Sequence, residues 1–196
     1  MDAISTLLTR CSAKRTVDPA PAPEDLHVML RAAVQAPDHG RLRPWRFITV
    51  QGEARHTLGR IFADALAERD PEASAAALER EAAKLLRAPL VIVVACHPSD
   101  GNGVPEIEQI VSAGAAAQNI LLAAYQLGYG AMWRTGAQAY DRTVHAALGL
   151  DQSDTIVGFV YVGTLESPLP ERVAVDPAPF VSEWTAPAPA PAPASV

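Results

Sequence analysis

The segment Ala36-Pro37-Asp38-His39-Gly40-Arg41-Leu42-Arg43-Pro44-Trp45-Arg46-Phe47 separates a stretch with helical periodicity from one with the character of a strand. Ala36 and Arg43 each precede a proline, and a residue in that position disfavours the helical backbone. The segment therefore predicts a loop of fixed shape that carries three arginines and a histidine. Loops on rigid scaffolds hold a large share of binding residues, which favours a ligand site over a plain connection with Trp45 as its core anchor.

Helical and strand patterns mix without strict alternation on both sides of this loop. Their spacing predicts helices over 2–9, 23–36, 53–68, 70–86, 106–127 and 141–148, and strands over 45–50, 90–96, 131–135 and 155–162. In the helix over 23–36 we expect Leu26, Leu30, Ala33 and Val34 to face inward. The run from Leu90 to Cys96 is apolar at every position, which predicts a central strand covered on both faces. The pattern is that of a three-layer α+β domain.

Length and composition indicate one folded unit. The chain has 196 residues, of which 49% are hydrophobic, enough for one sizeable core. No apolar run is long enough to cross a membrane, and the N-terminus lacks the pattern of a signal peptide, so we expect a cytoplasmic protein without a membrane partner. Cys11 and Cys96 lie too far apart to suggest a disulfide framework. Residues 1–184 are expected to form the domain, and the Ala/Pro-rich residues 185–196 a disordered tail.

The charge distribution favours a small anionic ligand. A net charge of -6 and a pI of about 5.3 argue against nucleic acid as the main partner. The cations are nevertheless clustered: Arg10, Lys14 and Arg15 occupy one short segment, and the loop quoted above holds three more. Local positive charge in an acidic chain indicates a ligand such as a phosphate.

Three short segments remain as candidate sites once standard catalytic motifs are excluded. The sequence has no P-loop, HExxH or GxSxG motif, and its five histidines show no metal-ligand spacing, so we expect no metal site. The hydroxyl of Ser12 between the cations of Arg10 and Lys14 suits a phosphate monoester, although a solvated helix end could hold the same residues. The other two segments are the loop around His39 and the run Trp133-Arg134-Thr135-Gly136. By residue type alone, Trp133 is more typical of a core.

Together these segments resemble the nitroreductase family of flavoproteins, over nearly the whole chain to about Glu183. The strongest signal is Ala36-Pro37-Asp38-His39 followed by Pro44-Trp45-Arg46-Phe47. Further matches are Arg10-x-Ser12-Ala13, Ser112-Ala113-Gly114, Trp133-Arg134 and Ile156-Val157-Gly158-Phe159.

The resemblance implies a fold, a cofactor and a partner. In this family a central mixed, mostly antiparallel sheet is wrapped by helices, and two chains form an intertwined homodimer with FMN in each of two clefts at the interface. It implies that the phosphate and one ring edge are held by Arg10, Cys11, Ser12 and Lys14. It also implies that Gln35 and His39 reach FMN from the partner chain, and that Trp133, Arg134 and Thr135 line the site.

Two departures from the family pattern concern the phosphate. Cys11 stands where a basic residue is common. After Gly163-Thr164 the family often has proline and then a basic residue, whereas here Leu165 follows and the next cation is Arg172.

The implied activity is FMN-dependent oxidoreduction by a two-step, ping-pong mechanism. NAD(P)H is the expected co-substrate, and a nitro compound, a quinone or a similar small molecule is the expected acceptor. No side-chain acid is required, and His39 is a candidate proton donor. Three alternatives stay open: a flavin-dependent reductase or dehydrogenase of another unsaturated substrate, a flavin-handling protein without turnover, and an interaction module that binds no flavin.

Overall fold

Antiparallel strands form the middle layer of the computed structural model, which describes residues 2–100 and 103–184. Over these residues the sheet has four strands, in the order β1 (Trp45–Gln51), β2 (Leu90–Cys96), β4 (Thr155–Gly163) and β3 (Gly130–Arg134). Every pairing among them is antiparallel, so the three-layer α+β fold is confirmed, and the sheet has no parallel pair within the described ranges. The predicted tail over 185–196 lies outside the described residues.

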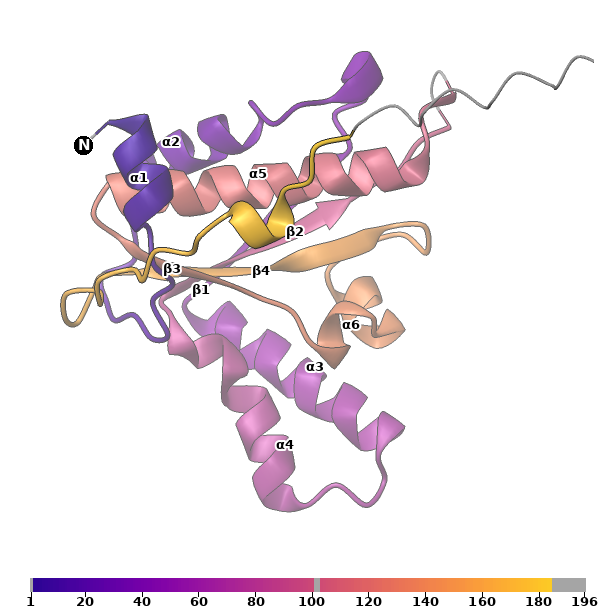
Figure 1. Cartoon of the computed structure of the whole chain (residues 1–196). Helices are drawn as coiled ribbons and strands as arrows, with labels where there is room; N and C mark the ends of the chain where they lie inside the picture. Colours follow the sequence, from indigo (N-terminus) through magenta and orange to yellow (C-terminus); the bar gives the residue numbers. More distant parts are fainter. Residues whose placement is uncertain (1, 101–102, 185–196) are drawn as a thin grey trace, which may run out of the picture.

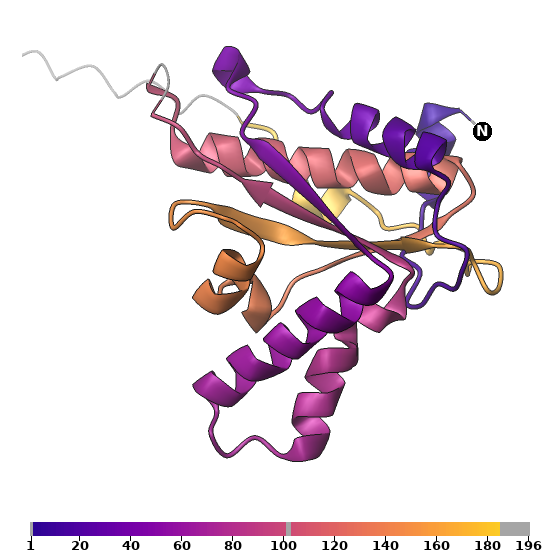
Figure 2. The same cartoon turned by 180° about the vertical axis from the view of Figure 1, so that it is seen from behind.

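Helices cover both faces of the sheet (Figures 1 and 2). On one face lie α1 (Ala3–Thr9), α2 (Pro23–Ala33) and α5 (Glu106–Gln126), and on the other lie α3 (Glu53–Arg69), α4 (Ala75–Ala82) and α6 (Arg142–Ala147). Short 3-10 turns are η1 (His39–Arg41), η2 (Ala83–Arg87), η4 (Ala137–Ala139) and η5 (Ala178–Phe180). Every residue of β2 is buried, which confirms the predicted central strand. No helix within the described ranges is long and apolar enough to span a membrane.

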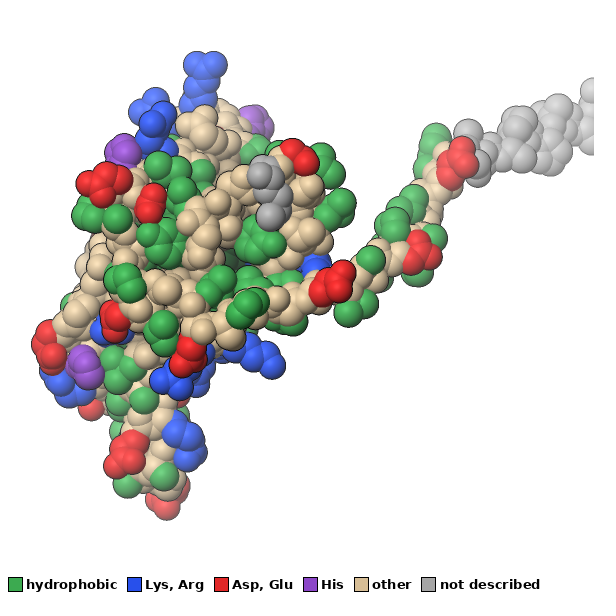
Figure 3. Space-filling view, turned by 90° about the vertical axis from the view of Figure 1, so that its left-hand side faces the viewer, with side chains coloured by type: hydrophobic (Ala, Val, Ile, Leu, Met, Phe, Trp, Pro, Cys, Tyr) green, Lys and Arg blue, Asp and Glu red, His purple; other side chains and the backbone are tan. Residues whose placement is uncertain are grey.

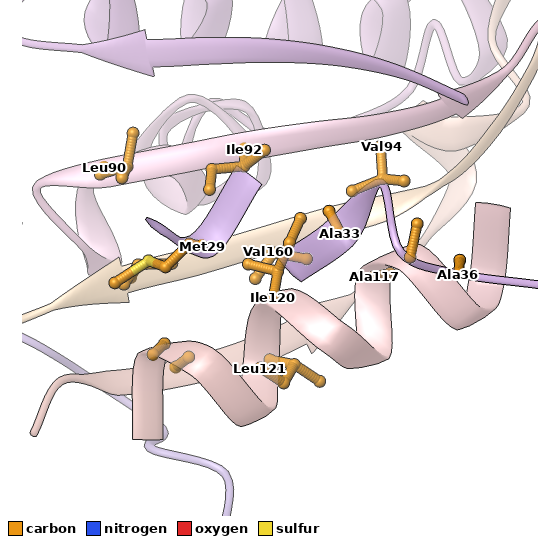
Figure 4. Packing of buried hydrophobic residues seen from close by; sticks show 14 residues of the cluster. Met29, Ala33, Ala36, Leu90, Ile92, Val94, Ala117, Ile120, Leu121 and Val160 are labelled. Atoms are coloured by element: carbon orange, nitrogen blue, oxygen red, sulfur yellow. The ribbon is translucent and has the colours of Figure 1, made fainter. Parts of the chain in front are cut away.

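The core on the α5 face shows why these segments fold together. Ile120 and Leu121 of α5 pack in one cluster with Met29 of α2 and the inward residues of β2 and β4 (Figure 4). Met29 and Ala33 are fully buried, whereas Val34, which we expected to face inward, is 42% exposed. Because α2 ends at Ala33, Val34 is its C-cap and no longer follows the buried stripe.

The predicted start of the fourth helix at Asp70-Pro71 is wrong. The backbone N–H of Asp70 donates to Leu66, so Asp70 closes the preceding helix α3. The helix α4 begins at Ala75, where the Ser74 hydroxyl accepts a hydrogen bond from the amide of Ala77. By contrast, the first helix begins where predicted: Asp2 is its N-cap, and the Asp2 carboxylate accepts a hydrogen bond from the amide of Ser5.

Candidate functional site

The loop that joins α2 to β1 has the fixed shape that its prolines predicted. The Asp38 carboxylate accepts hydrogen bonds from the amides of Leu42 (3.1 Å) and Arg43 (2.9 Å). Gly40 lies at a φ of 74°, and Arg41 and Arg43 also have positive φ values of 55° and 51°, which are costly for residues with a Cβ. Asp38 therefore holds the backbone in a shape that presents His39 and the arginines.

The segment after α1 lies directly along β3. The amide of Ala13 donates to the carbonyl of Ala131 at 3.0 Å, and Arg134 Nη2 donates to the carbonyl of Lys14 at the same distance. A Cβ on Gly130 would lie only 2.9 Å from the Cβ of Ala13. Two of the three predicted segments, residues 10–14 and 133–135, are thus neighbours.

A first pocket, which we call the Lys14 pocket, opens beside this contact. It has a volume of about 360 Å³ and is lined by Ser12, Ala13, Lys14 and Arg15 on one side and by residues 165–170 on the other. The hydroxyl of Ser12, the ammonium of Lys14 and the guanidinium of Arg15 are all hydrogen-bond donors. The Glu166 carboxylate also lines this pocket.

Arg172 reaches the same region from the C-terminal segment. Its Nη1 donates to the carbonyl of Arg10 at 2.8 Å, and Arg10 Nη1 donates to Ser12 Oγ at 3.5 Å. Burial and, next, the nearby Arg172 cation lower the pKa of Arg10 from its ordinary value. The Cys11 thiol is free and partly exposed. The structure therefore adds Arg172 to the predicted cluster of Arg10, Cys11, Ser12 and Lys14.

A second pocket, which we call the Arg134 pocket, contains residues that sequence reasoning missed. It has a volume of about 300 Å³ and is lined by Lys84, Arg87, Met132, Trp133, Arg134, Thr135, Gln138 and Tyr161. Among the described residues, three cations and no carboxylate line it. Lys84 is paired with Glu81 at 2.6 Å. In the sequence, Lys84 and Arg87 lie close together shortly before the buried strand β2, and this pattern was the available signal for the pocket.

The electrostatics of the Arg134 pocket suit a polar ligand with hydrogen-bond acceptors. Burial and, next, the Arg87 cation lower the pKa of Arg134. Its guanidinium lies over the ring of Tyr161 at 5.7 Å, and its Nε is buried without a hydrogen-bond partner. Burial raises the pKa of Tyr161 to about 12, so its phenol stays neutral at physiological pH. Unpaired buried donors of this kind are stabilised by an acceptor.

Trp133 is held in place by its neighbours on the next strand. Its indole Nε1 donates to the carbonyl of Val157 at 3.2 Å. A Cβ on Gly158 would lie 2.0 Å from the same nitrogen, so only glycine leaves room for the ring. Trp133 both packs against the core and lines the Arg134 pocket, which combines the two roles that sequence left open.

Neither Gln35 nor His39 lines the Lys14 pocket or the Arg134 pocket. Gln35 lines a pocket of about 490 Å³ between α1, α2 and α5, which we call the Gln35 pocket. His39 lines another of about 330 Å³ beside the first turns of α5, which we call the His39 pocket. His39 contacts Glu108 in the first turn of α5, whereas Thr6 of α1 donates to Gln126 in its last turn. Glu108 and Gln126 are 18 positions apart, which is about 27 Å along the helix at 1.5 Å per residue. Figure 1 shows α1 and the turn η1 at opposite ends of α5.

One further cluster of polar side chains lies away from these pockets. The ligand atoms of His97, Asp151 and Asp154 lie within 4.8 Å of one another. Asp154 is buried, and its carboxylate accepts hydrogen bonds from His97 Nδ1 at 2.6 Å and from the amide of Asp151 at 2.8 Å. The Asp154 carboxylate therefore has hydrogen-bond partners within the protein. That the chain binds no metal stays a prediction.

Comparisons with known proteins agree on one family. The model of the nitroreductase family matches residues 8–164. The Escherichia coli protein named "Putative NAD(P)H nitroreductase YdjA" is 37% identical over 183 residues, which is 93% of this chain and 99% of that protein. The solved nitroreductase-like family protein from Bacillus cereus has a TM-score of 0.80 at 22% identity, over 94% of this chain and 96% of that one. A solved nitroreductase from Bacteroides fragilis with bound FMN has a TM-score of 0.72 at 22% identity, and the match covers 93% of this chain and 98% of that one.

Proposed function

Because the chain belongs to the nitroreductase family, an oxidoreductase family, we propose that it is an FMN-dependent enzyme that passes electrons from NAD(P)H to small acceptors such as nitro compounds or quinones. The contact between Lys14 and Arg134 is the observation that carries this proposal, because it joins two donor-rich pockets into one region. A cofactor with a phosphate at one end and a polar ring at the other needs such an arrangement.

The donors present fit the two ends of FMN. Arg10, Ser12 and Lys14, together with Arg172, would hold the phosphate, since guanidinium, hydroxyl and ammonium groups all donate to phosphate oxygens. The buried, unpartnered Nε of Arg134 and the neighbouring Arg87 would face the carbonyl edge of the ring. Thr135 and Trp133 line the same pocket, as the resemblance implied.

We propose that Gln35 and His39 reach the cofactor from a second copy of the chain, as the family resemblance implies. Along α5, the contact of His39 and the contact of α1 lie about 27 Å apart in one chain, and Gln35 lies at the α1 end. In a homodimer with the cofactor at its interface, one copy would supply residues 10–14 and the other would supply Gln35 and His39. Both free cysteines agree with a reducing compartment, and we propose a cytoplasmic location.

The chemistry that FMN supplies when bound is two-electron transfer, from NAD(P)H in one half-reaction and to the acceptor in the other. The chain's own residues bind and orient: the cations fix the phosphate, and Trp133 fixes one wall through its bond to Val157. His39 is the candidate proton donor to the acceptor, a role that requires the imidazolium form, in which both ring nitrogens carry a proton.

The test begins with the absorption spectrum of the purified protein and with FMN titration of the apoprotein. We expect a yellow protein, and binding weakened about tenfold or more in Arg134→Gln, since a charged hydrogen bond contributes about 1.5–3 kcal/mol. Arg142→Gln is the matched control, because Arg142 donates to the Gln152 carbonyl away from both pockets. A folded protein that does not bind added FMN would exclude the proposal.

Anaerobic addition of NADH or NADPH separates the alternatives. An enzyme loses its flavin absorption quickly and regains it when a nitro compound or quinone is added. Slow reduction by both nucleotides would indicate a flavin-handling protein. Rapid reduction followed by indifference to nitro compounds and quinones would indicate a reductase of another unsaturated substrate.

A further inference from the structure

His39 is held by a carboxylate that the sequence did not associate with it. Its Nδ1 lies 2.6 Å from Glu108 Oε2. Glu108 belongs to the first turn of α5, and His39 to the turn η1, so residues 69 positions apart meet. The two side chains stand together at the rim of the His39 pocket, whose walls are Pro37, Ile107, Val111, Ser112 and Ala115.

The contact favours one ring nitrogen as the carrier of the proton, in a pair whose side chains are 67% and 46% exposed. An ionised carboxylate only accepts hydrogen bonds, so Nδ1 of His39 must be the donor to Glu108. In the neutral ring, Nε2 then carries the lone pair. In the part of the chain that the structure describes, Nε2 has no hydrogen-bond partner, so it is the nitrogen left for a ligand.

The backbone of His39 does not depend on Glu108. The Asp38 carboxylate fixes the loop through the amides of Leu42 and Arg43, and Gly40 packs against the segment before α5, where an added Cβ would lie 3.2 Å from Val104. Removal of the Glu108 side chain would therefore free the imidazole without releasing the loop. Glu108 acts on the ring alone.

We propose that Glu108 is the positioning residue of His39, which fixes the tautomer and orientation of the imidazole so that Nε2 faces the flavin bound by the second copy. This inference rests on the proposed function. It assigns to Glu108 a role exerted through His39, in the way that a partner on one imidazole nitrogen sets the state of the other.

The first measurement needs no flavin. Nitrogen-15 spectra of the neutral histidine rings should show Nδ1 of His39 protonated and Nε2 unprotonated in the wild type. In Glu108→Ala we expect the reverse, because free imidazole in water prefers the proton on Nε2. Glu106→Ala is the matched control: it removes another carboxylate from the same first turn of α5 and should leave the His39 signals unchanged.

The second measurement is the FMN dissociation constant of the same proteins. We expect binding by Glu108→Ala to be roughly tenfold weaker, the scale at which loss of an orienting partner weakens a ligand site. Glu106→Ala should bind like the wild type. Unchanged His39 signals in Glu108→Ala, or a reversed tautomer with unaltered FMN affinity, would overturn the inference. A wild type that never binds FMN would instead remove the proposed function, so the two failures are distinguishable.

Discussion

Gly158 on β4 allows the sharpest mutational test of the site. An alanine Cβ at this position would lie 2.0 Å from Nε1 and 2.5 Å from Cδ1 of Trp133, and 3.0 Å from the carbonyl oxygen of Arg134. These distances are far inside van der Waals contact, so the indole ring must move. Since Trp133 and Arg134 both line the Arg134 pocket, we expect Gly158→Ala to impair both stability and flavin binding.

Two effects set the size of this destabilisation. Overpacking in a core costs about 1–3 kcal/mol. Displacement of the ring also breaks the hydrogen bond from Trp133 Nε1 to the Val157 carbonyl, which contributes about 0.5–1.5 kcal/mol. For a chain of this size, a decrease of roughly 2–4 kcal/mol in the free energy of unfolding lowers the melting temperature by roughly 5–15 °C.

The assay is thermal unfolding followed by circular dichroism, with FMN titration of the folded protein. Gly114→Ala is the matched control, because its Cβ would meet the same indole at 3.7 Å, an ordinary contact. In that helix interior alanine should stabilise by about 0.5–1 kcal/mol. Gly158→Ala should therefore lower the melting temperature, and Gly114→Ala should raise it. Equal melting temperatures and equal FMN affinities for both variants and the wild type would refute the reasoning.

Three further predictions concern the loop and two buried groups. Asp38→Ala should destabilise the protein by about 1–3 kcal/mol and speed hydrogen exchange at the Leu42 amide, because two loop amides no longer have an acceptor; unchanged exchange would contradict this. A thiol reagent at pH 8 should modify Cys11 quickly and Cys96 only after denaturation, because burial raises the pKa of Cys96 to about 11; two fast thiols would contradict it. Burial raises the pKa of Tyr161 from 10.0 to about 12, so the folded state binds the proton more tightly, and the resulting stability is present below pH 10 and lost as the pH rises toward 12. Tyr161→Phe should therefore flatten the alkaline loss of stability measured by urea unfolding, and an unchanged slope would count against it.

Secondary structure was predictable where the chain signals its ends locally. The strand β2 matches its predicted bounds because an apolar, β-branched run begins after Pro89 and ends before His97. The helix α5 matches within one residue, since Pro105 precedes it and Gly128 follows. Asp70-Pro71, in contrast, is a pair typical of helix starts, but here Asp70 ends α3. The start of α4 is decided instead by Ser74, whose side chain caps the helix.

The residues that sequence reasoning missed are those that only tertiary pairing brings to the site. Arg87 lies three residues before β2, and Tyr161 lies in β4. The antiparallel register that sets Val91 opposite Tyr161 places both at one pocket. No local pattern encodes that register, so the cations before β2 signalled local charge, but the sequence could not place Arg87 and Tyr161 at one site. Lys14 and Arg134 were assigned, because the local charge pattern singled out both segments and the family resemblance implies a cofactor role for both.

Exposed apolar side chains lie where the proposed dimer needs a second surface. Ile107 and Val111 are each 63% exposed beside the His39 pocket, and Leu8 is 68% exposed at the other end of α5. Figure 3 shows the described C-terminal segment projecting from the body with hydrophobic side chains along it. Such surface usually marks an interface.

In the proposed homodimer, a two-fold axis would relate the same patch on both copies. If that axis crosses the middle of α5, the two α5 helices run antiparallel. The Arg10 end of one chain then lies beside the His39 end of the other, and the reverse holds at the opposite end of the pair. One symmetric contact would therefore complete two sites at once, and it would join the His39 end of α5 to the α1 end, which lie about 27 Å apart in a single chain.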